Sequence, residues 1–385
     1  MLLDEDTRMI QETVAKFVDR ELIPIESDVL KAKVSGDAGY GLSEAHNDRL
    51  RKVSKELGLW GLDAPVELGG QDLPAVTIAA VKEEMGRSCV NFTLPPDSPN
   101  LRMLNAVGTE AQKQRYLKPY IEGKMVSAIA ISEPGAGGDP AGLRTRAVLE
   151  GGQWVINGRK IWISNAKNAD FIIVMARVGE GQRRGGITSF IVDGNMKGIS
   201  YKVIPVIRAY APYEVHFDNV EVPVENRLGE EGGGFKLAEK WLVEGRVPYA
   251  AGTLGIAQAS LELAIDWAKQ REAFGSRLSE KQAIQWMLAD SEMELRAARL
   301  LTWAAAWKAD LGQDLKLDAS IAKVTATETA GRVVDRCIQI FGGLGVSKEL
   351  PLERWYRELR IKRIGEGPSE VQRMVVARNL LGNRG

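Results

Sequence analysis

The residue with the clearest chemical potential lies near the carboxyl end, where one carboxylate stands between two glycines. Glu366 is the acid in R-I-G-E-G-P-S-E-V-Q-R, residues 363–373. Flanking glycines let backbone and ligand approach closely, and a poorly hydrated carboxylate is a stronger base. We therefore predict that Glu366 is a catalytic base. The competing interpretation is a solvated acid in the first helical turn, where the helix dipole favours negative charge.

Three further motifs are separated along the chain. I-A-I-S-E-P-G-A-G-G-D-P-A-G covers residues 129–142 and is followed by a patterned run that ends in W-I-S-N at 162–165; R-E-A-F-G covers 271–275 and Q-I-F-G-G-L-G covers 339–345. G-A-G-G is not the dinucleotide fingerprint of a βαβ unit. Together with G-E-G, these motifs resemble the acyl-CoA dehydrogenase family of flavoproteins, in the family's order and over nearly the whole chain.

The resemblance implies a reaction, a cofactor and partners. Glu366 would take the α-proton of an acyl-CoA thioester while FAD accepts the β-hydrogen as hydride, giving a trans-2-enoyl-CoA. The backbone N–H of Glu366 and a ribityl hydroxyl of the flavin would stabilise the enolate. The resemblance also implies a homo-oligomer, as a tetramer, and a separate electron-transfer flavoprotein as electron acceptor.

The same resemblance assigns site residues position by position. Contacts to FAD are implied for Ile131, Ser132, Gly137, Gly138, Trp162, Ser164, Gln282, Pro368 and Glu370. Further FAD contacts from a neighbouring subunit are implied for Arg271, Phe274, Gln339, Gly342 and Gly343. Contacts to the substrate are implied for Gly138, Arg246, Gly365 and Gly367. Alone, Trp162 would be interpreted as a core aromatic, Ser132 and Ser164 as turn or strand hydroxyls, and Arg271 as a solvated cation.

Some family members carry their base at the position of Gly245. Glu244 is one residue away, and one residue turns a helix by about 100°, so Glu244 should face elsewhere. The chain also departs from the family where Gly138 replaces a common serine, Pro368 a frequent threonine and Gly365 a frequent aromatic. Because Gly245 and Gly365 both lack side chains, we expect a widened cavity and a branched or ring-bearing acyl group.

Other functions remain open at this point. A flavin monooxygenase of the same fold would need no base, and an acyl-CoA oxidase usually resembles a longer chain. A non-catalytic acyl-CoA or flavin-binding assembly factor would be marked by loss of the base. The presence of Glu366 argues against the monooxygenase and the non-catalytic factor, and the length of the chain argues against the oxidase, so a dehydrogenase is favoured.

Composition excludes several other classes. Lys+Arg and Asp+Glu both number 51 among 385 residues, so no nucleic-acid or membrane footprint is indicated. Cys89 and Cys337 are the only cysteines and argue against a disulfide framework, whereas two histidines make metal and His-triad chemistry improbable. The amino terminus lacks signal-peptide features and no apolar run approaches a membrane span. We expect a soluble, cytoplasmic protein.

The spacing of apolar residues, which predicts the elements that hold these side chains, changes twice along the chain. Helical spacing over 10–22, 50–59 and 75–85 predicts a helical domain at 1–125. Strands are expected at 146–149, 154–156, 160–164, 171–176, 187–192 and 213–222, with turns at 151–152 and 157–158. After glycines 229 and 232–234 the apolar residues again recur at helical spacing. One set lies at 256, 259, 263 and 267, and a second set lies at 284, 288, 295 and 298. Met287 and the tryptophans there are interpreted as core.

The predicted fold is therefore α+β and multidomain. It has an N-terminal helical domain at 1–125, a central β-barrel-like domain at 126–229 and a C-terminal four-helix bundle at 230–385.

Overall fold

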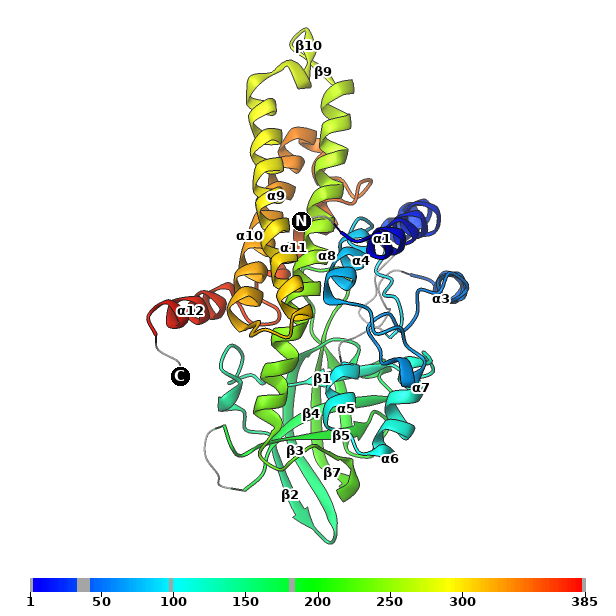
Figure 1. The fold of residues 1–385 in the computed structure, drawn as a ribbon, viewed down its shortest axis with the longest axis vertical. Coiled ribbons are helices and arrows are strands. Elements are labelled where there is room, and N and C mark those ends of the chain that lie inside the picture. The colour runs from blue at the N-terminus through cyan, green and yellow to red at the C-terminus, as the bar shows by residue number, and fades with distance from the viewer. Residues whose placement is uncertain (1–2, 33–41, 97–99, 180–183, 383–385) are drawn as a thin grey trace.

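The structure is a computed structural model that describes residues 3–32, 42–96, 100–179 and 184–382. Figure 1 shows long helices at one end of the molecule and a sheet at the other, with the first helices alongside. No helix in these ranges is long and apolar enough to span a bilayer.

The N-terminal part is helical, as predicted. Its α-helices are α1 (Glu5–Phe17), α2 (Glu26–Lys31), α3 (Glu44–Glu56), α4 (Ala75–Met85), α5 (Asn100–Val107), α6 (Glu110–Gln112) and α7 (Lys118–Ile121). Asp4 caps α1 by accepting a hydrogen bond from the Thr7 N–H at 2.7 Å. Val14 and Phe17 on its apolar face are buried, which explains the helical spacing.

The middle of the chain forms a sheet. Within the described residues its eight strands are β1 (Ser127–Ala130), β2 (Arg146–Glu150), β3 (Gln153–Ile163), β4 (Phe171–Arg177), β5 (Ile187–Asp193), β6 (Ile199–Val203), β7 (Tyr213–Pro223) and β8 (Arg227–Leu228). They run in the order β6-β7-β3-β2-β4-β5-β8, and β1 pairs in parallel with β4. The boundaries predicted after 125 and 229 fall in the connections from α7 to β1 and from β8 to α8.

One predicted turn is wrong. Gly151 and Gly152 do form a tight turn, with φ of 58° and 83°, between β2 and β3. Asn157 and Gly158 instead lie inside β3, where the pairing with β7 shifts register. A Cβ at Gly158 would lie 2.7 Å from the Cα of Thr145, so the glycine admits a close backbone approach rather than a hairpin.

The C-terminal part is a bundle. Its helices are α8 (Gly234–Gln270), α9 (Gln282–Asp310), α10 (Lys316–Phe341), α11 (Leu352–Lys362) and α12 (Ser369–Leu380), with a small hairpin of β9 (Glu272–Ala273) and β10 (Ser276–Arg277) after α8. Buried alanines let α8, α9 and α10 pack closely, and α4 packs on α8 and α9. Met287 packs on this core, but Trp286 and Trp307 are 61% and 49% exposed, so their assignment to the core is wrong.

Candidate active site

Glu366 lies in the loop between α11 and α12, three residues before α12 begins, with a φ of 54°. It is therefore not a first-turn acid. Lys323 of α10 donates to the carbonyl oxygens of Arg363 and Gly367 at 3.2 and 2.9 Å, and the Ser369 N–H donates to Arg363 at 3.1 Å. These bonds close the loop around the carboxylate.

Two more polar side chains approach the peptide that follows Glu366. Gln372 Nε2 lies 3.1 Å from the carbonyl oxygen of Gly367 and 3.4 Å from that of Glu366, and Arg246 Nε lies 3.5 Å from the latter. No hydrogen bond among the described residues uses the N–H of Glu366. That donor is left available to a ligand.

The carboxylate itself is desolvated. Its Oε2 is covered and has no hydrogen-bond partner among the described residues. Burial raises the pKa of Glu366 to about 7, although Lys362, Arg246 and Lys323 act in the opposite direction. A carboxylate with a pKa near neutrality suits a general base.

Two further residues of the site, Lys323 and Gln372, were not predicted from the sequence, and both are fully buried. The available signal was a long polar side chain among buried alanines: Lys323 lies on the face of α10 shared by Ala319, Ala322 and Ala326. Buried lysines are rarely left without partners. Burial lowers the pKa of Lys323 to about 8.

Gly245 of α8 lies beside the carboxylate of Glu366. A Cβ at Gly245 would lie 3.5 Å from Oε2 of Glu366 and would touch nothing else. Glu244 instead points to Lys240, 3.8 Å away on the same helix. The expectation that Glu244 faces elsewhere is confirmed.

The space expected beside Gly365 is not open. A Cβ at Gly365 would lie 3.0 Å from the hydroxyl oxygen of Tyr249. Tyr249 of α8 thus fills the place of an aromatic at 365, so this part of the expected widening is wrong. A Cβ at Gly245, in contrast, would make an ordinary contact with the Glu366 carboxylate and no close one.

The segment proposed to follow the flavin is fixed by a buried ion pair. Lys160 of β3, which is fully buried, lies 2.8 Å from Oε1 of Glu133 and donates to the carbonyl oxygen of Ile131 at 2.9 Å. The Ile161 N–H donates to the Ser132 carbonyl at 2.9 Å. Burial lowers the pKa of Lys160 to about 8 despite Glu133. Neither Glu133 nor Lys160 was predicted from the sequence.

Trp162 and Ser164 lie on the surface beside this segment. Trp162 has a φ of 62° and is 54% exposed, so the interpretation as a core aromatic does not hold. Ser164 and Glu370 are exposed as well, whereas Ile131 and Ser132 are partly exposed.

The glycine-rich loop joins this surface to the loop of Glu366. A Cβ at Gly137 would meet nothing, whereas one at Gly138 would lie 3.2 Å from Val371 Cγ2 and 3.7 Å from Pro368 Cγ. Val371 therefore crowds the place of the missing serine side chain. An exposed aromatic, open backbone and adjacent hydroxyls fit a flat, polar cofactor such as FAD.

The remaining candidate residues lie at the far tip of the bundle, which Figure 1 shows at the top. Arg271, Phe274, Gln282, Gln339, Gly342 and Gly343 are all exposed there, and Phe274 is completely so. Along α8, Gly245 and Gln270 are roughly 38 Å apart at about 1.5 Å of rise per residue. One chain therefore does not bring the two groups together.

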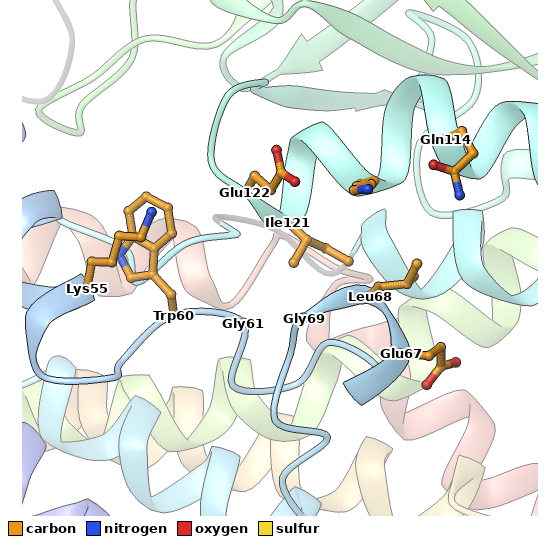
Figure 2. A pocket seen from close by; sticks show the side chains of 10 residues that line it. Lys55, Trp60, Gly61, Glu67, Leu68, Gly69, Gln114, Ile121 and Glu122 are labelled. Atoms are coloured by element: carbon orange, nitrogen blue, oxygen red, sulfur yellow. The ribbon is translucent and has the colours of Figure 1, made fainter.

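A separate hollow of about 460 Å³ lies on the N-terminal helical part. Figure 2 shows Lys55 and Trp60 at one side of it and Gln114 and Glu67 at the other. No candidate site residue lines it, so we assign it no role in the chemistry.

Comparisons with known proteins agree along the whole chain. Family models match residues 4–124 (acyl-CoA dehydrogenase, N-terminal domain), 128–220 (middle domain) and 232–381 (C-terminal domain). A (R)-benzylsuccinyl-CoA dehydrogenase of Thauera aromatica is 40% identical over 98% of this chain and 96% of that protein.

Solved structures give the same result. Butyryl-CoA dehydrogenase from Megasphaera elsdenii superposes with a TM-score of 0.89 at 34% identity, over 99% of each chain. An FAD complex of PigA superposes with a TM-score of 0.89 at 26% identity, over 100% of each chain. The chain belongs to the acyl-CoA dehydrogenase family of FAD-dependent oxidoreductases.

Proposed function

We propose that the protein oxidises an acyl-CoA thioester to the trans-2-enoyl-CoA, with Glu366 as the base that removes the α-proton. The observation that carries the proposal is the buried, unpartnered Oε2 of Glu366, whose pKa burial raises to about 7. FAD, when bound, supplies the acceptor for the β-hydrogen as hydride.

The chain's own groups would assist in two ways. The free N–H of Glu366 is a donor for the thioester oxygen, on which negative charge develops as the α-proton leaves. Arg246 and Gln372 approach the Glu366 carbonyl, and Lys323 holds the carbonyl of Gly367, so the backbone around the base is fixed before substrate binds. Ser132, Ser164 and Trp162 would bind and orient the flavin.

We also propose that the flavin site is completed by a second copy of the chain. The exposed residues at the bundle tip, with Arg271 suited to phosphate, support this proposal. A row of exposed apolar residues at seven-residue spacing on α9, Trp286, Met293, Leu300 and Trp307, gives the copies an apolar seam. A tetramer and an electron-transfer flavoprotein as acceptor are further parts of the proposal.

Anaerobic mixing of the yellow holoenzyme with a panel of CoA thioesters tests the activity. We expect loss of the flavin absorbance with at least one saturated thioester, together with formation of the 2-enoyl-CoA. A flavin that stays oxidised with every thioester would contradict the proposal. Reoxidation by air as fast as turnover would favour an oxidase.

A further inference from the structure

A second cavity is connected to the surroundings of the candidate base through one lining residue, Lys362. It has a volume of about 170 Å³ and is lined by α4, the segments 88–94 and 209–210, α8 and α11. Lys362 lines it and lies only four residues before Glu366, whose pKa it lowers. Tyr249, one turn after Gly245 on α8, packs against Lys362 on the side of the base. Lys362 and Tyr249 therefore stand between the cavity and the loop of Glu366.

Several charged side chains line this cavity, whereas a site for a plain alkyl chain would be apolar. Lys82, Arg354 and Lys362 line it, with Glu358 as the acid among the lining residues. Glu358 is already held by Arg208, through Nε at 2.9 Å and Nη2 at 2.5 Å. Burial raises the pKa of Glu358, but Arg208 and, to a smaller extent, Lys362 and Arg354 outweigh it, so the pKa is lowered and this acid stays ionised with its hydrogen bonds to Arg208.

Lys362 has the carboxylates of Glu358 and Glu366 in its surroundings but no ion pair with either of them. Its Nζ lies 4.1 Å from the centre of the Tyr249 ring, and it forms no salt bridge within the described part of the chain. Burial lowers its pKa, Arg208 and Lys82 act in the same direction, and the charges of Glu358 and Glu366 offset only part of this effect. An ammonium in such a place is costly unless an anion pairs with it.

We propose that the acyl group of the substrate carries a carboxylate and that Lys362 binds it in this cavity, so that the substrate is a CoA monothioester of a dicarboxylic acid. This inference rests on the proposed dehydrogenase function. A cavity of about 150 Å³ can hold a six-carbon ring, so a short carboxyalkyl arm fits the available volume. A hydrogen bond to a charged group contributes about 1.5–3 kcal/mol.

The test compares acids with their neutral esters. Glutaryl-CoA and adipyl-CoA are compared with their monomethyl esters, and kcat/KM is taken from flavin reduction by the holoenzyme. Wild type is expected to prefer the free acids by on the order of 10–100-fold. Lys362→Met should abolish that preference by slowing the acids, and Lys362→Arg should keep part of it. Lys362→Met also changes the surroundings of Glu366, which would affect acids and esters alike. The readout is therefore the kcat/KM of each acid divided by the kcat/KM of its ester.

The matched control is Lys240→Met, since Lys240 is 63% exposed and pairs with Glu244 on its own helix. It should leave the ratio unchanged. If Lys362→Met does not fold, Lys362→Gln removes the same charge. Equal rates for acids and esters in wild type, or an unchanged ratio in both neutral variants, would overturn the inference and leave the dehydrogenase function intact.

A binding measurement separates this inference from the proposed reaction. Calorimetry with the Glu366→Gln holoenzyme should show that glutaryl-CoA binds on the order of tenfold or more tightly than its ester, with no chemistry required. Equal affinities would overturn the inference. Tighter binding of the acid would support it even if no thioester reduced the flavin, which would be the failure of the proposed function alone.

Discussion

The ammonium of Lys323 lies 2.9 Å from the carbonyl oxygen of Gly367 and 3.2 Å from that of Arg363, which ties the middle of α10 to both sides of the Glu366 loop. Lys323→Met keeps the length of the side chain but removes one hydrogen bond from each carbonyl, and the two carbonyls then keep only the bonds from the Ser369 N–H and the Gln372 side chain. A hydrogen bond from a charged donor contributes about 1.5–3 kcal/mol, and removing the buried charge offsets part of the loss. We expect the free energy of urea unfolding to fall by about 2–5 kcal/mol and turnover to fall with it.

Lys316→Met is the control for that prediction. Lys316 is on the same helix and pairs with Glu239, but both are 45% exposed, and surface pairs contribute about 0–1 kcal/mol. Equal stability losses in the two variants would show that the bonds of Lys323 to the loop have no special role.

Glu366→Gln should retain the fold and the flavin while losing dehydrogenation by on the order of 10²–10⁴-fold, because the amide cannot accept the α-proton. Single-turnover flavin reduction under anaerobic conditions measures the loss. Glu244→Gln is the matched control, since Glu244 pairs with Lys240 and should leave the rate unchanged. Near wild-type reduction by Glu366→Gln would reject the assignment.

The pH profile follows from the raised pKa of Glu366. The base must be ionised to accept a proton, and its pKa in the free protein is about 7. We therefore expect kcat/KM to rise about tenfold per pH unit below pH 7 and to level off above it. A profile flat from pH 5 to pH 8 would mean that another group, or a pKa near the ordinary carboxyl value, controls the reaction.

Sequence patterns predicted helices and strands well where apolar residues recur at regular spacing along the segment. The apolar period of 75–85 corresponds to α4, and the runs at 171–176, 187–192 and 213–222 fall within β4, β5 and β7. Asn157-Gly158 failed because Thr145, from the neighbouring strand region, sets the need for glycine there. A local hairpin signal carries no information about such a contact.

The candidate site also contains some residues that could be predicted from the sequence and others that could not. Glu366 could be predicted because its neighbours in sequence are its neighbours in space. Lys323, Gln372 and Tyr249 could not, since each reaches the loop from another helix, and only the packing of α8, α10 and α12 brings them together.

Arg271→Ala should lower the ratio of FAD to protein after gel filtration, because the guanidinium is proposed to bind a phosphate of the flavin held by another copy. The effect should grow with ionic strength, which weakens the remaining phosphate contacts. Lys269→Ala is the control: Lys269 is 64% exposed and pairs with Asp266. An unchanged ratio for Arg271→Ala would remove this arginine from the cofactor site.

Tyr249 and Gly365 should behave as a coupled pair, because a Cβ at Gly365 would lie 3.0 Å from the Tyr249 hydroxyl. Gly365→Tyr alone should destabilise the protein by about 1–3 kcal/mol through overpacking. Tyr249→Ala alone should leave a cavity, whereas the double variant should recover most of the loss, since one aromatic then replaces the other. Urea unfolding of all four proteins gives the coupling energy, which we expect to be about 0.5–3 kcal/mol. Simple additivity of the two single losses would show that the Tyr249 hydroxyl does not limit what position 365 can hold.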